Sequence, residues 1–334
     1  MLPSWYTEPH IVVAILLVCA GFYLLIKGAD LLVDGAVIVA NKFSLSPAVI
    51  GATVVAFGTS MPELVVSIGA NIKAISMGAT GPNGPAAIAV GNIVGSNIFN
   101  IAAILGIMAI MTPLKIPVST AKFEYPLMIL SLMILIVFSF ITTGDYQISR
   151  IEGVILFLGL VFFTYFSVTL GKVPAGEIEE AQSHHGSMLH AILVIIAGML
   201  MLCIGGEITL NGALSISEKI GLSERVIGLT VMAIGTSLPE LVTSVQAVRK
   251  KETEMAIGNI VGSNLFNIFS VIGITSMIIP LPVSENTLFF DYWWMLGFSL
   301  IIFPFILTKK AIGRKTGVFF VVALISYISI ILCN

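Results

Sequence analysis

Apolar runs long enough to cross a lipid bilayer follow one another along nearly the whole chain. Four such runs, which together contain one charged residue, are residues 11–26, 125–142, 151–170 and 318–333. A spanning helix needs roughly 20 mostly apolar residues. Only 10% of the 334 residues are charged, against roughly a quarter in a soluble domain. The sequence therefore predicts an all-α polytopic membrane protein without a soluble domain.

Polar breaks divide the chain into ten predicted transmembrane helices. Their approximate bounds are residues 11–40, 45–72, 86–111, 125–143, 151–170, 189–215, 225–248, 255–279, 288–307 and 317–333. The loops on one side of this arrangement hold eleven Lys and Arg, and those on the other side hold four. Because cytoplasmic loops are enriched in Lys and Arg, we expect a plasma-membrane protein with both termini outside the cell. The first ten residues contain no Lys or Arg, so no cleavable signal peptide is expected.

Two segments of the first half recur in the second half. Residues Ile50–Ala70 match Ile227–Ala247 at 14 of 21 positions, and Ala89–Ile101 match Ala256–Ile268 at 11 of 13. The chain is therefore an internal duplication. Each half has five predicted spans, and an odd number forces the two halves to cross the membrane in opposite senses. Inverted repeats of this kind are typical of secondary transporters, which bind their substrates near the bilayer midplane.

The duplication sets the predicted domain boundaries. Residues 1–170 form the N-terminal five-helix repeat and residues 189–334 the C-terminal one, with a cytoplasmic linker over residues 171–188. We interpret the polar linker as a flexible connector. A regulatory cation site on His184 and His185 is the alternative.

The first repeated motif places hydroxyl groups and a carboxylate on one helix face. It reads GTSMPE in one half and GTSLPE in the other. Its polar members, at i, i+1 and i+4, are Thr59, Ser60 and Glu63, and Thr236, Ser237 and Glu240. Proline removes a helical hydrogen bond, so carbonyls of the preceding turn, from Ala56 and from Ala233 onward, should lack full intrahelical partners. A carboxylate at bilayer depth costs at least about 2.5 to 3.5 kcal/mol and indicates a functional site.

The second repeated motif reads GNIVGSNIFN and GNIVGSNLFN. It spaces polar side chains four residues apart on one face, and these are Asn92, Ser96 and Asn100, and Asn259, Ser263 and Asn267. Hydroxyls in membrane helices often bond to the carbonyl four residues earlier, and glycines spaced by four often serve helix packing. Each polar residue taken singly therefore has a structural alternative.

Together the two motifs offer hydroxyl, amide, carbonyl and carboxylate oxygens without Cys or His. Such a set suits a hard cation such as Ca²⁺ or Na⁺ and disfavours zinc or copper. Two facing carboxylates repel each other unless bound positive charge compensates. One Ca²⁺ or two Na⁺ would neutralise the pair. Occupancy by one cation therefore opposes occupancy by the other, which is the coupling that antiport requires.

At these motifs the sequence resembles the cation/Ca²⁺ exchanger superfamily, and its prokaryotic sodium/calcium exchanger branch in particular. The resemblance covers both halves. It implies a ten-helix inverted repeat in which Glu63 and Glu240 bind both Ca²⁺ and Na⁺, helped by the carbonyls of Thr59 and Thr236. The sodium sites it implies are completed by Ser60, Ser96, Ser237, Ser263 and the carbonyls of Ala56 and Ala233, while Asn100 and Asn267 line the middle.

Two details bear on the choice of coupling ion. The proton/calcium branch typically has Gly-Asn-Ala-x-Glu where this chain has Gly-Thr-Ser-x-Pro-Glu, which favours sodium coupling. Many relatives, including potassium-dependent exchangers, carry Asp at the position of Asn267. The amide removes a negative charge, so the resemblance gives no support for potassium co-transport here.

The leading interpretation is an antiporter, not an enzyme, that extrudes Ca²⁺ in exchange for Na⁺ by alternating access. The resemblance implies three Na⁺ per Ca²⁺ and a sliding pair formed by the first and sixth spans. A proton-coupled antiporter for Ca²⁺ or another divalent cation is the alternative, and a passive cation channel is a weaker one. The expected partners are Ca²⁺, Na⁺ and lipid, without a cofactor, nucleic acid or required protein partner. Asp30, Asp34 and Glu207 lie near ends of the sliding spans, where we expect an interfacial or gating role.

Overall fold

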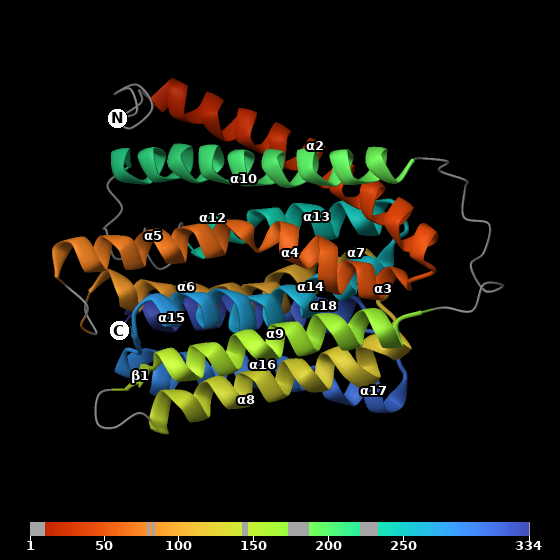
Figure 1. Cartoon of the computed structure of the whole chain (residues 1–334). Helices are drawn as coiled ribbons and strands as arrows, with labels where there is room; N and C mark the ends of the chain where they lie inside the picture. Colours follow the sequence, from red (N-terminus) through yellow and green to blue (C-terminus); the bar gives the residue numbers. More distant parts are fainter. Residues whose placement is uncertain are drawn as a thin grey trace.

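The computed structural model describes residues 11–78, 81, 84–141, 146–172, 187–220 and 233–333. Apart from two short strands, the regular elements of this part are helices. The two longest are α2 (Ile11–Phe43) and α10 (Met188–Lys219). They lie side by side along one edge of the bundle (Figure 1). A Cβ on Gly28 would stand 2.9 Å from the Gly198 carbonyl oxygen, so small residues let the two backbones approach closely.

The second and seventh predicted spans are broken helices. The second consists of α3 (Pro47–Ile50), η1 (Gly51–Val55), α4 (Ala56–Thr59) and α5 (Met61–Met77), with a bend of 40° at Ser60. The described part of the seventh consists of α12 (Ala233–Thr236) and α13 (Leu238–Arg249), interrupted at Ser237. Both breaks precede a proline, as the repeated motif predicts.

The third and eighth predicted spans form the centre of the molecule. They are α6 (Pro85–Phe99), η2 (Asn100–Leu105) and α7 (Gly106–Met111), and α14 (Thr253–Phe266), η5 (Asn267–Ile272) and α15 (Gly273–Ile278). Their apolar windows are 83% and 94% buried, whereas the other full-length spans are 22% to 39% buried. Both helices that carry the asparagine-rich motif are therefore shielded from lipid by the rest of the protein.

Close backbone contact holds the broken helix against the central one. Gly258 and Gly262 of α14 lie directly against the main chain at Ala48 and Ala52, so a Cβ at either glycine would collide with it. The contact fixes the distance between α14 and the η1 turn that precedes the break.

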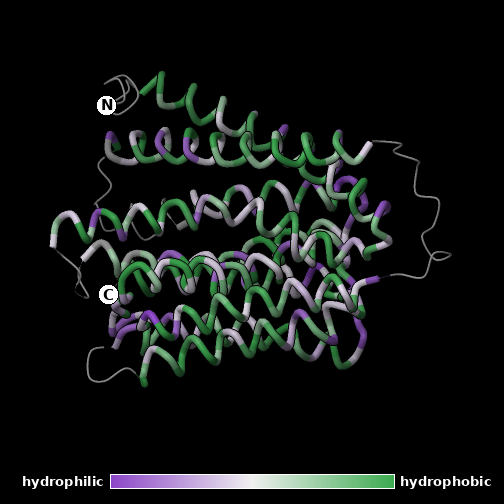
Figure 2. Tube along the Cα trace, in the orientation of Figure 1, coloured by the Kyte–Doolittle hydropathy of each residue, from purple (hydrophilic) through white to green (hydrophobic). Residues whose placement is uncertain are grey.

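The remaining helices complete the lipid-facing side of the bundle. They are η3 (Thr120–Glu124), α8 (Tyr125–Ile141), α9 (Arg150–Leu170), η6 (Thr287–Asp291), α16 (Tyr292–Ile301), α17 (Phe303–Thr308) and α18 (Arg314–Cys333). A short antiparallel pair, β1 (Gln147–Ile148) and β2 (Leu281–Pro282), links two loops. Hydrophobic residues dominate these spans (Figure 2), and side chains such as Leu158 and Val322 are more than half exposed.

The all-α membrane fold is confirmed, but the count of ten spans stays a prediction. Eight helices of the described part are long and apolar enough to cross a membrane, or nine if the bent pair is one span. The start of the seventh predicted span falls in residues 221–232, outside the described residues. The N- and C-termini are marked at the same end of the bundle (Figure 1), as an even number of spans requires. The linker histidines of the alternative regulatory site also lie outside the described residues.

Candidate cation site

The two carboxylates of the repeated motifs lie at the helix breaks and are fully buried. Glu63 is in the first turn of α5 and Glu240 in the first turn of α13, and both are 0% exposed. In each, Oε1 accepts a serine hydroxyl while Oε2 has no hydrogen-bond partner. Neither forms an ion pair with a Lys, Arg or His of the described residues. Burying an unpaired charge is costly unless a cation compensates it.

Serine hydroxyls bond to both carboxylates and link the two halves of the chain. Ser60 Oγ donates to Glu240 Oε1 at 3.2 Å, and Ser96 Oγ donates to Glu63 Oε1 at 3.4 Å. Ser237 Oγ donates in turn to Ser96 Oγ at 2.9 Å. Residues that are distant in sequence thus form one polar cluster around the two helix breaks.

The threonines of the two breaks make matching contacts with the central helices. Thr59 Oγ1 donates to Asn259 Oδ1 at 3.3 Å and lies 3.3 Å from Ser263 Oγ. Thr236 Oγ1 donates to Asn92 Oδ1 at 3.2 Å. Each broken helix therefore packs its polar turn against the polar stripe of the opposite half.

The carbonyl groups before the break only partly follow the prediction. Pro62 provides no N–H for the carbonyl of Gly58, four residues earlier. The Ala56 carbonyl, in contrast, keeps its helical bond with Ser60 N at 3.0 Å, and Thr59 Oγ1 lies 3.3 Å from it as an alternative donor. The expectation that the Ala56 carbonyl lacks an intrahelical partner is therefore wrong. Ala233 begins α12 at the corresponding place.

Asn100 and Asn267 occupy the starts of two π-helical segments, η2 and η5. Both side chains are 0% exposed, and neither Oδ1 atom has a hydrogen-bond partner among the described residues. π-helical turns inside α-helices are frequent at functional sites. Asn267 Nδ2 also donates to Ser96 Oγ at 3.1 Å, which joins this asparagine to the cluster around Glu63.

The cluster has the chemistry of a site for hard cations. Four of its buried oxygens have no hydrogen-bond partner in the part of the chain that the structure describes, and they are Glu63 Oε2, Glu240 Oε2, Asn100 Oδ1 and Asn267 Oδ1. Ca²⁺ and Na⁺ prefer carboxylate, amide and hydroxyl oxygens. No three His, Cys, Asp or Glu gather as a metal-binding group among the described residues, so only two formal negative charges are available here.

Several buried polar residues near the cluster were not singled out from the sequence. Ser67 lies one turn after Glu63 and Ser244 one turn after Glu240, and both are 0% exposed. Ser244 Oγ accepts from Asn259 Nδ2 at 3.0 Å. Their spacing of four residues from each carboxylate was the signal that could have identified them.

Asn97 and Asn264 were also missed. They contact the two site asparagines directly, with Asn100 Nδ2 donating to Asn264 Oδ1 and Asn267 Nδ2 donating to Asn97 Oδ1, each at 2.9 Å. Neither residue belongs to the predicted polar stripe, but both copies of the second repeated motif have Asn at this position.

A second charged cluster ties α2 to the end of α13. Lys250 Nζ lies 2.7 Å from Asp34 Oδ1 and 3.4 Å from Asp30 Oδ1, and it donates to the Asp30 carbonyl at 3.0 Å. In the repeat, Lys73 of the first half corresponds to Lys250 of the second half, and Asp30 of the first half corresponds to Glu207 of the second half. Lys73 and Glu207 are both described and exposed, and they form no ion pair with each other.

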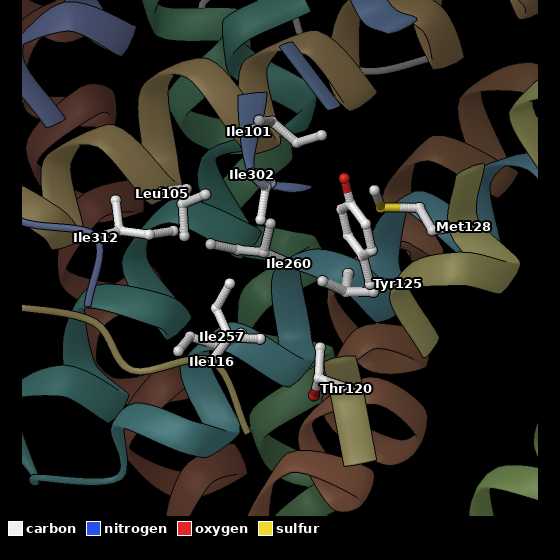
Figure 3. A pocket seen from close by; sticks show the side chains of 11 residues that line it. Ile101, Leu105, Ile116, Thr120, Tyr125, Met128, Ile257, Ile260, Ile302 and Ile312 are labelled. Atoms are coloured by element: carbon white, nitrogen blue, oxygen red, sulfur yellow. The ribbon is translucent and has the colours of Figure 1, made fainter. Parts of the chain in front are cut away.

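A small apolar pocket lies apart from the ion cluster. Its lining comes from the central helices and their neighbours and consists of Ile101, Leu105, Ile116, Thr120, Tyr125, Met128, Ile257, Ile260, Val261, Ile302 and Ile312 (Figure 3). None of the predicted ion ligands lines it. An apolar cavity of this kind offers no ligands to a cation and is expected to stay dry.

Known proteins are similar to this chain over most of its length. A family model for the sodium/calcium exchanger protein matches residues 13–169 and 190–333. The sodium/calcium exchanger MaX1 of Methanosarcina acetivorans is 31% identical over 96% of this chain and 99% of its own length. The putative antiporter CaxA of Alkalimonas amylolytica is 33% identical over 94% and 97%.

Solved structures show the same similarity. A structure of the sodium-calcium exchanger NCX_Mj, soaked with Na⁺ and Sr²⁺, superposes with a TM-score of 0.79 at 30% sequence identity. The superposition covers 96% of this chain and 99% of that one. Since the family model matches both halves and full-length relatives share about a third of their residues, the chain belongs to the sodium/calcium exchanger family, whose members are transporters and not enzymes.

Proposed function

We propose that this protein is a Na⁺/Ca²⁺ antiporter whose cations bind at the cluster around Glu63 and Glu240. The observation that carries the proposal is the pair of fully buried carboxylates. Among the described residues, each has an oxygen without a partner and neither has a cationic side chain in ion-pair contact. Cations taken from solution would supply the missing positive charge. The relative MaX1 is named as a sodium/calcium exchanger, which supports sodium as the coupling ion.

The proposed ligands are those of the two repeated motifs. Carboxylate oxygens come from Glu63 and Glu240, and further oxygens come from Thr59, Ser60, Ser96, Asn100, Thr236, Ser237, Ser263 and Asn267 and from the carbonyls of Ala56 and Ala233. The hydrogen bonds among these side chains support a single shared site. Ca²⁺ would bring two positive charges to the two carboxylates, and Na⁺ ions would bring them one at a time. Sharing makes the two cations compete, and competition couples their movements.

The conformational part of the proposal uses α2 and α10 as the moving pair. Lys250 holds α2 through Asp30 and Asp34 at one end of the bundle. The corresponding residues of the other half, Lys73 and Glu207, are separate. We propose that these contacts of Lys250 with Asp30 and Asp34, called the Lys250 latch below, close the cytoplasmic side in this conformation. A Lys73 contact with Glu207 would replace it when access alternates, as inverted repeats allow.

The arrangement in the cell follows from the same proposal. The two repeats would be residues 1–170 and 189–334, joined by a cytoplasmic linker at 171–188, in the plasma membrane with both termini outside. Exchange of three Na⁺ for one Ca²⁺ would move net positive charge inward during Ca²⁺ extrusion. Matching contacts such as Thr59 with Asn259 and Thr236 with Asn92 support the repeat assignment.

Flux measurements in proteoliposomes test the proposed function. Purified protein is reconstituted, gradients of Na⁺, H⁺ and K⁺ are imposed one at a time, and uptake of radiolabelled Ca²⁺ is followed. We expect uptake only with an outward Na⁺ gradient, and we expect a membrane potential to change its rate. Uptake driven by a pH gradient and indifferent to Na⁺ would establish proton coupling instead. Ca²⁺ flux without any counter-ion gradient, together with large unitary currents, would establish a channel.

A further inference from the structure

Four buried asparagines interlock between the central helices. Asn97 and Asn264 are 2% exposed, and Asn100 and Asn267 are 0% exposed. Asn267 Nδ2 donates to Asn97 Oδ1 and Asn100 Nδ2 donates to Asn264 Oδ1, each at 2.9 Å. Asn97 Nδ2 donates to the Asn264 backbone carbonyl at 3.4 Å, and Asn264 Nδ2 donates to the Asn97 backbone carbonyl at 3.5 Å. The two helices therefore exchange the same set of bonds in both directions.

The backbone carbonyls give this network a direction. An amide side chain has a donating end and an accepting end, and its hydrogen-bond partners determine which end lies where. A carbonyl can only accept, so the Nδ2 of Asn97 must face the Asn264 carbonyl. The Oδ1 of Asn97 then faces Asn267, and Asn267 must donate to it with its Nδ2. By the same reasoning, the Nδ2 of Asn264 must face the Asn97 carbonyl, so the Oδ1 of Asn264 faces Asn100 and accepts from its Nδ2.

The network determines which end of each site asparagine is left available to a ligand. With Nδ2 of Asn267 and Asn100 engaged, their Oδ1 atoms are the ones left without partners. The Nδ2 of Asn267 also reaches Ser96 Oγ, and Ser96 in turn donates to Glu63. A rotation of either amide by half a turn would replace an acceptor oxygen by a donor N–H₂, which repels a cation.

We propose that Asn97 and Asn264 are positioning residues that fix the amide orientation of Asn267 and Asn100 and thereby keep two carbonyl oxygens available for Ca²⁺ and Na⁺. The inference rests on the proposed function only in taking this cluster as the cation site. The oxygens of Asn97 and Asn264 accept the bonds that orient Asn267 and Asn100, so the proposal gives these two residues a positioning role. The competing explanation is that the asparagines only tie the two helices together.

A double-mutant cycle on Ca²⁺ binding separates these explanations. Ca²⁺ affinity of purified protein is measured by titration calorimetry at alkaline pH for the wild type, Asn97→Ala, Asn267→Asp and the double variant. An ionised Asp presents an oxygen in either orientation, so it needs no orienting partner. We expect Asn97→Ala to weaken Ca²⁺ binding about tenfold in the wild-type background, and less than about twofold in the Asn267→Asp background.

The reciprocal pairing supplies the control within the same molecule. Asn97 orients Asn267 and not Asn100, so Asn97→Ala should keep its full effect in an Asn100→Asp background. The mirror cycle of Asn264→Ala with Asn100→Asp replaces the first if Asn97→Ala does not fold. Thermal unfolding without ions reports folding, and Ser139→Ala serves as a comparison because Ser139 is a buried hydroxyl bonded to Tyr292 outside the cluster.

Two results would overturn the inference. One is unchanged Ca²⁺ affinity in folded Asn97→Ala and Asn264→Ala, and the other is an equal loss in both the Asn267→Asp and the Asn100→Asp backgrounds, as a purely structural role requires. The readout is equilibrium binding and not exchange. A protein that binds Ca²⁺ but fails to exchange it for Na⁺ would therefore contradict the proposed function while leaving the cycle interpretable.

Discussion

Ser60 Oγ donates a 3.2 Å hydrogen bond to Glu240 Oε1, across 180 positions of sequence. The bond joins the helix break of the first half to the carboxylate of the second half. It places residues from both copies of the first repeated motif in one buried cluster. A change in the charge of either carboxylate should therefore affect ligands from both halves.

Replacing either site carboxylate should abolish cation exchange. Glu63→Gln and Glu240→Gln each remove one of the two buried negative charges while keeping the side-chain shape. We expect Na⁺-driven Ca²⁺ uptake to fall by at least about a hundredfold, since losing a charged ligand in a buried site costs about 3 kcal/mol or more. The measurement is initial uptake in proteoliposomes at matched protein density.

The matched control for these variants is Glu124→Gln. Glu124 is also a buried carboxylate in the membrane region, at 1% exposed, but it belongs to η3 and takes no part in the hydrogen bonds described for the cluster. Its uptake should stay within about twofold of the wild type, a difference of less than about 0.5 kcal/mol. Equal losses of Ca²⁺ uptake in all three variants would mean that removing any buried carboxylate impairs the protein, and would contradict a specific role of the cluster.

Replacing Asn267 by Asp should create a third charge at the site. Ca²⁺ affinity of Asn267→Asp should exceed that of the wild type at alkaline pH, because an ionised carboxylate attracts the cation. Protons compete with the cation for the new carboxylate, so the advantage should vanish as pH falls. The measurement is the Ca²⁺ dissociation constant as a function of pH for both proteins. Parallel pH profiles would place Asn267 away from the bound cation.

Removing the Lys250 latch should favour access from the cytoplasmic side. The Lys250 and Asp30 side chains are 29% and 30% exposed, and ion pairs of this exposure contribute about 0.2 to 1 kcal/mol. Lys250→Gln should therefore lower the Na⁺ concentration for half-activation on the cytoplasmic face, by up to about fivefold. Oriented vesicles allow this measurement on each face.

Lys73→Gln provides the comparison from the other half. If Lys73 and Glu207 close the outer side in the alternate conformation, this variant should shift half-activation on the outer face instead. Identical shifts on one face for both variants, or no shift for either, would contradict the paired latches.

Adding a methyl group to a glycine that packs against another backbone should destabilise the fold. Gly262→Ala would drive a Cβ into the backbone at Ala52, and overpacking of this kind costs about 1 to 3 kcal/mol. Gly297→Ala is the control, because Gly297 is exposed and has no described atom near its Cβ position. Thermal unfolding in detergent should show a lower midpoint for the first variant and an unchanged or higher one for the second. Equal midpoints would show that the α14 contact can relax.

The fold class and the positions of most helices follow from the sequence because lipid leaves a chain few choices. Every backbone group must be bonded internally, so long apolar runs become helices. The two breaks were also predictable, since Pro62 and Pro239 cannot complete the helical ladder. The duplication then brought together residues that no local pattern could connect, such as Ser60 with Glu240.

The π-helical segments were not predictable from spacing. A stripe at every fourth residue assumes a continuous α-helix, but η2 and η5 begin at Asn100 and Asn267 themselves. Whether a turn becomes α or π depends on tertiary packing and not on local propensity. The roles of Asn97 and Asn264 were hidden for the same reason, because their partners lie on the opposite central helix.

Competition between Na⁺ and Ca²⁺ for one site is the central claim. Radiolabelled Ca²⁺ bound to purified protein at equilibrium, measured against rising Na⁺ concentration, tests it most directly. We predict that Na⁺ displaces Ca²⁺ completely and with a steepness above one, and that Glu63→Gln and Glu240→Gln bind neither cation. Ca²⁺ binding that is unaffected by saturating Na⁺ would contradict the shared site.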